Sequence, residues 1–243
     1  MKGRKPARRG SKYEKKFVEL VNKNREFNKN LRRYFGNTSK PIKAIMVMDN
    51  KLKSDVMLLV NDSLYGCSIK VSEADFSQLD RRWLDDLAEK LNMPVDIIDM
   101  LQKCITNKMN NKNDKFILDK YKDQIIYYFK NNIRHLLKEL FVRKEDFLKY
   151  LIVCFYIDNN WYITKIIDVF EYIENGEIYT TSKGVLRFGD CLSMQRKGGN
   201  GRHVKVPKNH PSHPGNQIQF KLKPISLINN MPSNKIFKIY PND

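Results

Sequence analysis

Residues 53–60 read Lys-Ser-Asp-Val-Met-Leu-Leu-Val, and residues 67–71 read Cys-Ser-Ile-Lys-Val. A polar turn that begins at Asn61 separates the two apolar runs, so they predict two adjacent strands. Such strands place Asp55 and Lys70 at the same edge of a sheet. Ser68 shares a face with Lys70, because side chains in a strand alternate with period two.

This trio has the chemistry for metal-assisted hydrolysis of a phosphodiester. The Asp55 carboxylate can hold a hard divalent cation through oxygen, and Lys70 beside it can position or deprotonate a water. The spacing by itself is a weak signal that chance produces often. Its structural alternative is an aspartate in a strand-entry turn and a lysine that extends from a strand end into solvent.

The chain has 243 residues, a formal net charge of +18 and a pI of about 9.7. This excess favours a polyanionic partner, nucleic acid before membrane, over a protein made soluble by charge alone. No apolar stretch reaches the roughly 18 residues of a membrane span, and the basic residues 1–9 lack the apolar segment of a signal peptide. The four cysteines are scattered without a Cys-x-x-Cys pair, which favours reduced thiols in the cytoplasm.

The pattern of apolar residues predicts a mixed α/β (α+β) protein that forms one domain over residues 1–243. Within it we expect a catalytic meander at about 41–71, a helical middle at about 76–149 and a strand-rich DNA-recognition part at about 150–230. The expected helices cover 11–34, 76–91, 94–104, 116–148 and 168–173. The expected strands cover 42–48, 56–60, 66–71, 150–157, 161–163, 184–194 and 217–222.

Several segments taken together resemble a known family. After the Asp55 and Lys70 strands come Phe-Ser-Gln-Leu-Asp-Arg-Arg-Trp-Leu at 76–84, Phe-Gly at 188–189, Gln-Arg-Lys-Gly-Gly-Asn-Gly-Arg at 195–202 and Gln-Ile-Gln-Phe-Lys at 217–221. This set resembles the small type II restriction endonucleases of the HinP group, which cut palindromes such as GCGC, and more distantly the MspI-like enzymes. The resemblance implies a PD-(D/E)xK restriction-endonuclease-like core, with a mixed central sheet flanked by helices.

The same resemblance implies Mg²⁺-dependent cleavage of double-stranded DNA at a short, four-base-pair site that contains G and C. It assigns catalytic roles to Asp55, Ser54, Ser68, Lys70 and Glu14, and metal contacts to Asp55, Glu14 and the carbonyl of Ile69. Ser68 is a departure, because the HinP group carries an amide there. For Glu14 the alternative is a solvated residue on a helix face that pairs with a lysine.

DNA contacts are expected from side chains that pair with base edges in the major groove. They are Gln78, Arg82, Gln195, Arg196, Lys197, Arg202, Gln217, Gln219 and Lys221. Strand alternation prevents them all from facing one way, and for Arg196 and Lys197 a phosphate contact without readout is the alternative. Gln78 and Arg82 are expected as i,i+4 neighbours on one helix, where they would face the phosphate backbone or intrude on the duplex. Residues 203–215 form an extra loop compared with the HinP group.

The expected partner is double-stranded DNA, bound by a monomer or weak homodimer in a prokaryotic cytoplasm, alongside a DNA methyltransferase that protects host sites. Two alternatives stay open. A non-catalytic nucleic-acid-binding module, RNA binders included, explains the charge but not the pairing of Asp55 with Lys70. A structure-specific repair nuclease would share the catalytic residues and differ in its substrate.

Overall fold

The computed structural model describes residues 4–49, 52–71, 76–143, 145, 149–157, 159–199 and 204–240, although not the side chains of 4–11 or 150–156. The contacts divide the chain into two compact units. Unit 1 contains residues 1–77, 141–171 and 224–243, and unit 2 contains residues 78–140 and 172–223. The expectation of a single domain stays a prediction.

Unit 1 is built on a six-stranded mixed sheet in the order β1-β2-β3-β5-β6-β11. These strands are β1 (Lys43–Met46), β2 (Val56–Val60), β3 (Ser63–Val71), β5 (Tyr150–Tyr156), β6 (Trp161–Lys165) and β11 (Phe237–Ile239). The pairs β1–β2 and β2–β3 are antiparallel, which confirms the predicted meander. The pair β3–β5 is parallel, so the sheet is mixed.

Two helices precede this sheet where the sequence predicted one. Helix α1 (Arg4–Lys23) and helix α2 (Arg25–Tyr34) are separated at Asn24, whose backbone is extended. The Asn24 side chain accepts a hydrogen bond of 2.8 Å from Phe27 N and so caps α2. The prediction of one continuous helix over 11–34 was therefore wrong at this residue.

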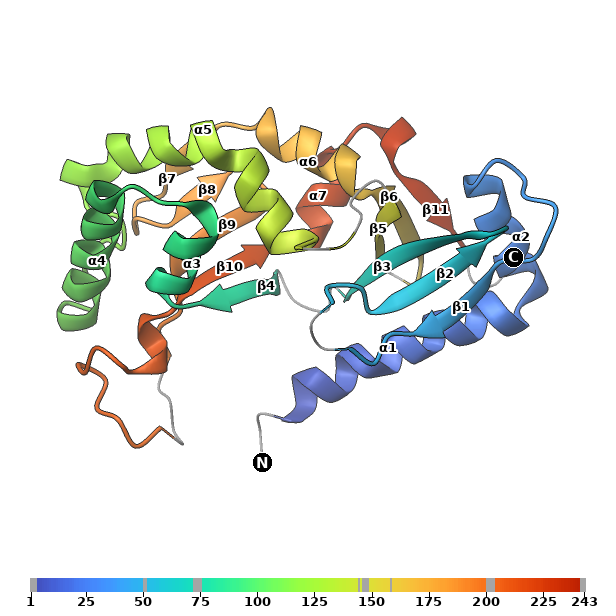
Figure 1. The fold of residues 1–243 in the computed structure, drawn as a ribbon, viewed down its shortest axis with the longest axis horizontal. Helices are drawn as coiled ribbons and strands as arrows, with labels where there is room; N and C mark the ends of the chain where they lie inside the picture. Colours follow the sequence, from blue (N-terminus) through green and yellow to red (C-terminus); the bar gives the residue numbers. More distant parts are fainter. Residues whose placement is uncertain are drawn as a thin grey trace. The chain divides into compact units, whose positions relative to one another are not determined.

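Helix α1 packs against β1 and β3, and Figure 1 shows it running along the β1–β3 part of the sheet. An aromatic cluster fixes this packing. The rings of Phe17 on α1 and Trp161 on β6 lie 5.1 Å apart, and Phe27 on α2 lies 5.9 Å from Phe17. All three side chains are fully buried, so they contribute much of the apolar burial that holds α1 and α2 to unit 1.

Unit 2 contains a second, five-stranded sheet in the order β4-β10-β9-β8-β7. Its strands are β4 (Ser77–Arg82), β7 (Ile178–Thr180), β8 (Leu186–Phe188), β9 (Leu192–Arg196) and β10 (Ile218–Leu222). The predicted strand over 184–194 is thus two strands, because the chain turns at Gly189, where φ is +58°. The strand predicted over 217–222 is confirmed as β10.

The helix predicted over 76–91 was wrong in its first half. Ser77–Arg82 forms β4 beside β10, and only Leu84–Leu91 is helical, as α3. Of the apolar residues that suggested a helix, Leu84 and Leu87 lie on α3, whereas Leu79 lies on β4. Pairing with β10 decides the state of 77–82, as tertiary context commonly does for short segments.

The remaining helices are α4 (Val95–Asn110), α5 (Lys122–Phe141), α6 (Ile166–Glu174) and α7 (Pro224–Asn230). Helix α4 continues past residue 104, where the predicted helix ended, and Pro94 stands at its N-cap. The helix predicted over 116–148 is shorter and begins after a 3-10 turn at Asp119–Tyr121. None of the helices in the described part of the chain is long and apolar enough to cross a bilayer.

Candidate active site and nucleic-acid interface

Asp55 is held by its backbone at the entry to β2. Its N–H donates to Cys67 O over 2.7 Å, and its carbonyl accepts from Val47 N over 3.0 Å. The residue is therefore tied to the segments on both sides, and its half-buried carboxylate stands at the edge of the meander. Burial, followed by the charge of Asp55, raises the pKa of the neighbouring Cys67 thiol.

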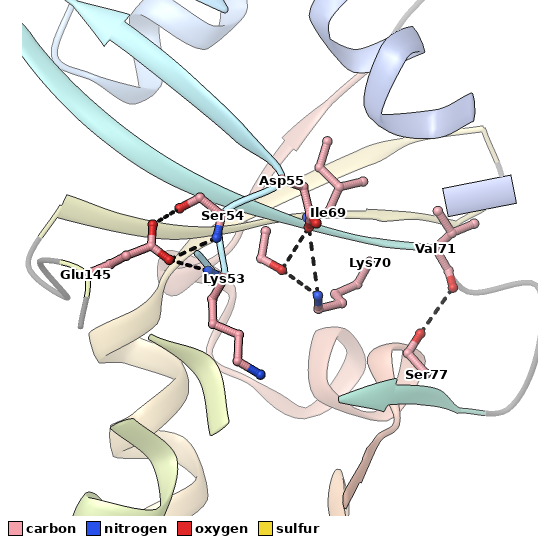
Figure 2. A network of polar contacts seen from close by, with 9 residues as sticks. Lys53, Ser54, Asp55, Ile69, Lys70, Val71, Ser77 and Glu145 are labelled. Carbon is pink, nitrogen blue, oxygen red and sulfur yellow. Dashed lines mark hydrogen bonds and ion pairs between the residues drawn. The ribbon is translucent and has the colours of Figure 1, made fainter. Parts of the chain in front are cut away.

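Ser68 and Lys70 converge on this carboxylate, as strand alternation predicted. Asp55 Oδ2 accepts hydrogen bonds from Ile69 N at 2.7 Å and from Ser68 Oγ at 3.1 Å. Lys70 donates to Ser68 Oγ, and its Nζ lies 4.0 Å from Asp55 Oδ2. The structure thus brings a carboxylate, a hydroxyl and an ammonium group into one hydrogen-bonded cluster (Figure 2).

Glu145 is a residue of this site that the sequence reasoning missed. Its carboxylate accepts hydrogen bonds from Lys53 N, from Ser54 N at 3.0 Å and from the Ser54 hydroxyl. Figure 2 shows it holding the two residues that lead into Asp55. Ser54 is only 5% exposed, and its buried hydroxyl donates a hydrogen bond to the Glu145 carboxylate. No local signal could have found Glu145, because it lies 91 residues from Ser54 along the chain.

Glu14 on α1 lies close enough to the cluster for their charges to interact. Burial raises the pKa of the Glu14 carboxyl, the charge of Asp55 raises it further, and the charge of Lys70 opposes both. Two carboxylates that repel each other across a partly buried space favour a bound cation between them.

A β-bulge lies at Ile69. The register of β3 against β5 shifts between Ile69 and Lys70, because Ile69 is opposite Val153 and Lys70 is opposite Phe155. Bulges are common beside active sites, where they redirect neighbouring groups. This one falls at the residue whose carbonyl was expected to contact the metal.

The oxygen donors near Asp55 fit Mg²⁺ in kind. They are two carboxylates, hydroxyl groups and a backbone carbonyl, all hard ligands. No group of three or more His, Cys, Asp or Glu side chains that could hold a metal ion occurs among the residues that the structure describes. Mg²⁺ keeps several waters and needs only one or two protein carboxylates.

The predicted DNA contacts in unit 2 divide between two faces of its sheet. Gln195 is directly opposite Gln219, and Lys221 is opposite Ser193, so these side chains share one face. Arg187 is also opposite Ser193 and joins this face. We call Arg187, Gln195, Lys197, Gln219 and Lys221 the polar sheet face.

The cations of the polar sheet face are partly desolvated. Burial, then the charge of Arg187, lowers the pKa of Lys221. Burial, then the charge of Arg81, lowers the pKa of Lys197, whose N–H continues the strand pairing to Gln217 O at 2.8 Å. Arg81 and Arg187 were not among the expected contacts. Arg187 stands between the apolar residues Leu186 and Phe188, an alternation that was a usable signal.

Arg196 lies on the other face of β9. It is opposite Ile218, and this face otherwise carries buried apolar residues such as Met194 and Phe220. Its guanidinium is bound by the buried Asn216 side chain, at 2.9 Å from Nε and 2.7 Å from Nη2. Arg196 is therefore separated from Gln195 and Lys197, as alternation required.

Gln78 and Arg82 lie on the strand β4, which corrects their expected place on one helix. Gln78 Oε1 accepts a hydrogen bond of 2.8 Å from Gln219 and so belongs with the polar sheet face. Arg82 pairs with Asp80 and lies 3.6 Å from Glu139, with its side chain 10% exposed. The pair with Glu139 joins β4 to α5, whereas the pair with Asp80 lies within β4. Arg202 lies outside the described residues.

Comparisons with known proteins agree with this geometry. The family model described as R.HinP1I restriction endonuclease matches residues 39–228. A search of curated proteins found no match.

Among solved structures, the fold resembles that of the restriction endonuclease MspI in complex with its cognate DNA. The TM-score is 0.61 at 15% identity, over 90% of this chain and 91% of that one. This likeness confirms the expected mixed α+β restriction-endonuclease fold. The family match covers most of the chain, so the chain belongs to the R.HinP1I restriction endonuclease family and is a site-specific deoxyribonuclease.

Proposed function

We propose that this protein is a Mg²⁺-dependent type II restriction endonuclease. It would hydrolyse double-stranded DNA at a short palindrome, four base pairs long and containing G and C. The observation that carries the proposal is the hydrogen-bonded cluster of Asp55, Ser68 and Lys70 at the edge of the meander. Family membership and the net charge of +18 support DNA as the polyanion that the protein cleaves.

Asp55 and Glu14 would hold the metal, together with the carbonyl of Ile69. When bound, Mg²⁺ supplies positive charge that stabilises the transition state at phosphorus and acidifies a water molecule. Within the described residues, Oδ2 is the atom of the Asp55 carboxylate that accepts hydrogen bonds. The other oxygen, Oδ1, would then be available to the cation. Ser54 precedes Asp55 in the chain, and the Ser68 hydroxyl donates to the Asp55 carboxylate. Both hydroxyl groups would hydrogen-bond waters around the metal.

Lys70 would orient the attacking water and stabilise the negative charge that develops on the phosphate oxygens. Its ammonium group donates to Ser68 Oγ, which fixes one of its three N–H bonds. The other two N–H bonds then remain for water and phosphate. Glu145 would act on this chemistry through residues 53 and 54, whose backbone N–H groups and Ser54 hydroxyl it binds, by holding the segment that presents Asp55.

The polar sheet face would read the bases. It presents amides and cations on one surface, and these groups match the acceptor and donor patterns of G·C and A·T pairs in the major groove. Readout by arginine or lysine favours guanine, which is the reason for expecting G and C in the site.

Cleavage of plasmid DNA tests the proposal. We expect the purified protein with Mg²⁺ to cut linear plasmid into discrete fragments, whose sequenced ends share one four-base-pair palindrome. Omission of divalent metal with EDTA should abolish cleavage. Cleavage of branched DNA alone would instead indicate a repair nuclease, and DNA binding without cleavage under any metal would indicate a non-catalytic module.

A restriction endonuclease endangers its own host unless host sites are modified. The proposal therefore pairs this protein with a DNA methyltransferase of the same specificity. We expect methylation of plasmid DNA by that enzyme to block cleavage. The protein would act as a monomer or weak homodimer, which sedimentation at working concentrations can determine.

A further inference from the structure

Unit 2 contains a basic pocket on the opposite side of β9 from the polar sheet face. The pocket has a volume of about 240 Å³, and its lining residues are Lys108, Met109, Lys112, Arg196, Gly198, Gly199, Lys208 and His213. Four of these residues are lysine or arginine, and none is acidic. A pocket with this lining is suited to an anion.

Arg196 is fixed before any ligand arrives. Asn216 is 3% exposed, and its carbonyl oxygen accepts from both Nε and Nη2 of the guanidinium. The Asn216 amide nitrogen in turn donates to His210 O and Pro211 O, both at 2.9 Å. The extra loop therefore scaffolds Asn216, and Asn216 orients Arg196.

The remaining edge of the guanidinium is available to a ligand. In the described part of the chain, Arg196 Nη1 has no hydrogen-bond partner. An arginine whose orientation is already set loses little side-chain freedom when it binds an anion. Burial also lowers the pKa of Arg196, which indicates that its charge is partly withdrawn from water.

Positive charge is concentrated around this guanidinium. Burial lowers the pKa of Lys108, and the charges of Arg196 and Lys183 lower it further. The opposing acidic group is Asp114, an exposed residue outside the pocket lining that accepts from Asn107 at 3.1 Å. The lining cations repel one another, so an anion between them would relieve that repulsion.

The backbone leaves room for close approach. Gly198 and Gly199 have φ angles of +63° and +92°, and a Cβ on either would meet no described atom within 4 Å. The His213 ring is buried and accepts a hydrogen bond of 3.0 Å from Gly215 N through Nδ1, so it forms part of the pocket wall.

We propose that this basic pocket binds a phosphate group of the DNA backbone, with Arg196, Lys112 and Lys208 as its cationic ligands. The proposal rests on the proposed function, because it takes double-stranded DNA as the substrate. It separates Arg196 from base readout, which stays with the polar sheet face. The extra loop is then a phosphate-binding element that determines how the duplex is held.

The test compares two double variants that lose the same charge. Lys112→Gln with Lys208→Gln alters the pocket, and Lys130→Gln with Lys165→Gln removes two exposed lysines elsewhere. Binding to a cognate and a random duplex is measured over a salt series with Ca²⁺ in place of Mg²⁺. A second arm scans the cognate duplex with single methylphosphonate linkages, each of which removes one backbone charge.

We expect the pocket variant to weaken binding to both duplexes about equally. The slope of log K against log salt should become shallower by about one unit relative to the control pair. At one backbone position, a methylphosphonate should weaken binding by the wild-type protein more than binding by the pocket variant, which keeps only Arg196 of the three proposed ligands. Thermal melting confirms that both variants are folded.

Two results would overturn the proposal. A salt slope equal to that of the control pair would show that the pocket neutralises no phosphate, and a loss confined to the cognate duplex would show that it reads a base. Failure of the proposed function would look different from failure of the pocket proposal. In that case the wild-type protein itself would not cut plasmid DNA at discrete sites. Arg196→Lys provides a second variant for the same binding assay, since it keeps the positive charge but loses the paired hydrogen bonds to Asn216.

Discussion

Replacement of Glu145 tests how the active site is held together. Glu145→Ala removes the acceptor of two backbone N–H groups and of the Ser54 hydroxyl. Hydrogen bonds to a charged acceptor contribute about 1.5–3 kcal/mol each when buried. Lys53 and Glu145 are half-exposed, and water can replace part of this loss, whereas Ser54 is buried.

We therefore expect Glu145→Ala to reduce the free energy of unfolding by about 2–3 kcal/mol in total, mainly at Ser54. For a chain of this size that is a fall in Tm of roughly 5–10 °C. Cleavage well below Tm should slow by roughly 10- to 100-fold, the effect typical of a group that orients a metal ligand. The Mg²⁺ concentration at half-maximal rate should also rise, because Asp55 is no longer fixed.

The assay is plasmid cleavage over a Mg²⁺ titration, with melting curves on the same preparations. Glu145→Gln keeps one carbonyl oxygen acceptor and should fall between the wild type and Glu145→Ala. Glu19→Gln is the matched control, since it removes one carboxylate of an exposed pair with Lys23, and such pairs contribute little. Wild-type rates and Mg²⁺ dependence in Glu145→Ala at 25 °C would refute a positioning role and leave only a structural one.

Asp55→Ala and Lys70→Ala should each abolish cleavage and leave DNA binding in Ca²⁺ largely intact; full activity in either variant would contradict the assigned site. Ser68→Ala should slow cleavage by roughly 10- to 100-fold, and an unchanged rate at limiting Mg²⁺ would make Ser68 a bystander. Lys197→Ala should cost about 1–3 kcal/mol of binding on the cognate duplex and much less on random DNA; equal losses measured on both duplexes would instead indicate a phosphate contact.

The hairpin that carries Asp55, Ser68 and Lys70 was predictable because its information is local. Asp55 and Ser68 are 13 residues apart, and one polar turn between two apolar runs determines how the strands pair. Strand periodicity then places Ser68 and Lys70 on one face. The arrangement of these three side chains accordingly matches the sequence-based expectation.

Glu145 and Asn216 could not be found in the same way. Glu145 reaches Ser54 only after β3 and β5 have paired in parallel, across 91 residues of chain. Asn216 contacts Arg196 because the loop before β10 folds back on the end of β9. No periodic pattern encodes such contacts, because they depend on tertiary structure and not on the spacing of neighbouring residues.

The strand β4 is a case in which the local sequence pattern gave a wrong prediction, because it predicted a helix over residues that form a strand. Residues 77–82 adopt a strand because β10 offers an edge for pairing, and Gln219 then meets Gln78 across the two strands. A helical reading put Gln78 and Arg82 on one helix face. In the structure the two residues have different partners, since Arg82 pairs with Asp80 and Glu139.

The serine at position 68 preserves the geometry that the site requires. Ser68 Oγ donates to Asp55 Oδ2 and accepts from Lys70, so one hydroxyl links the carboxylate to the ammonium group. The link keeps Nζ 4.0 Å from Asp55 Oδ2, which is beyond hydrogen-bond distance. A direct contact would commit a Lys70 N–H to Asp55 and occupy carboxylate surface that a metal ion needs. In the proposed mechanism Ser68 would thus keep both groups available for the metal and the substrate, although it is shorter than the amide carried by the enzymes that this chain resembles.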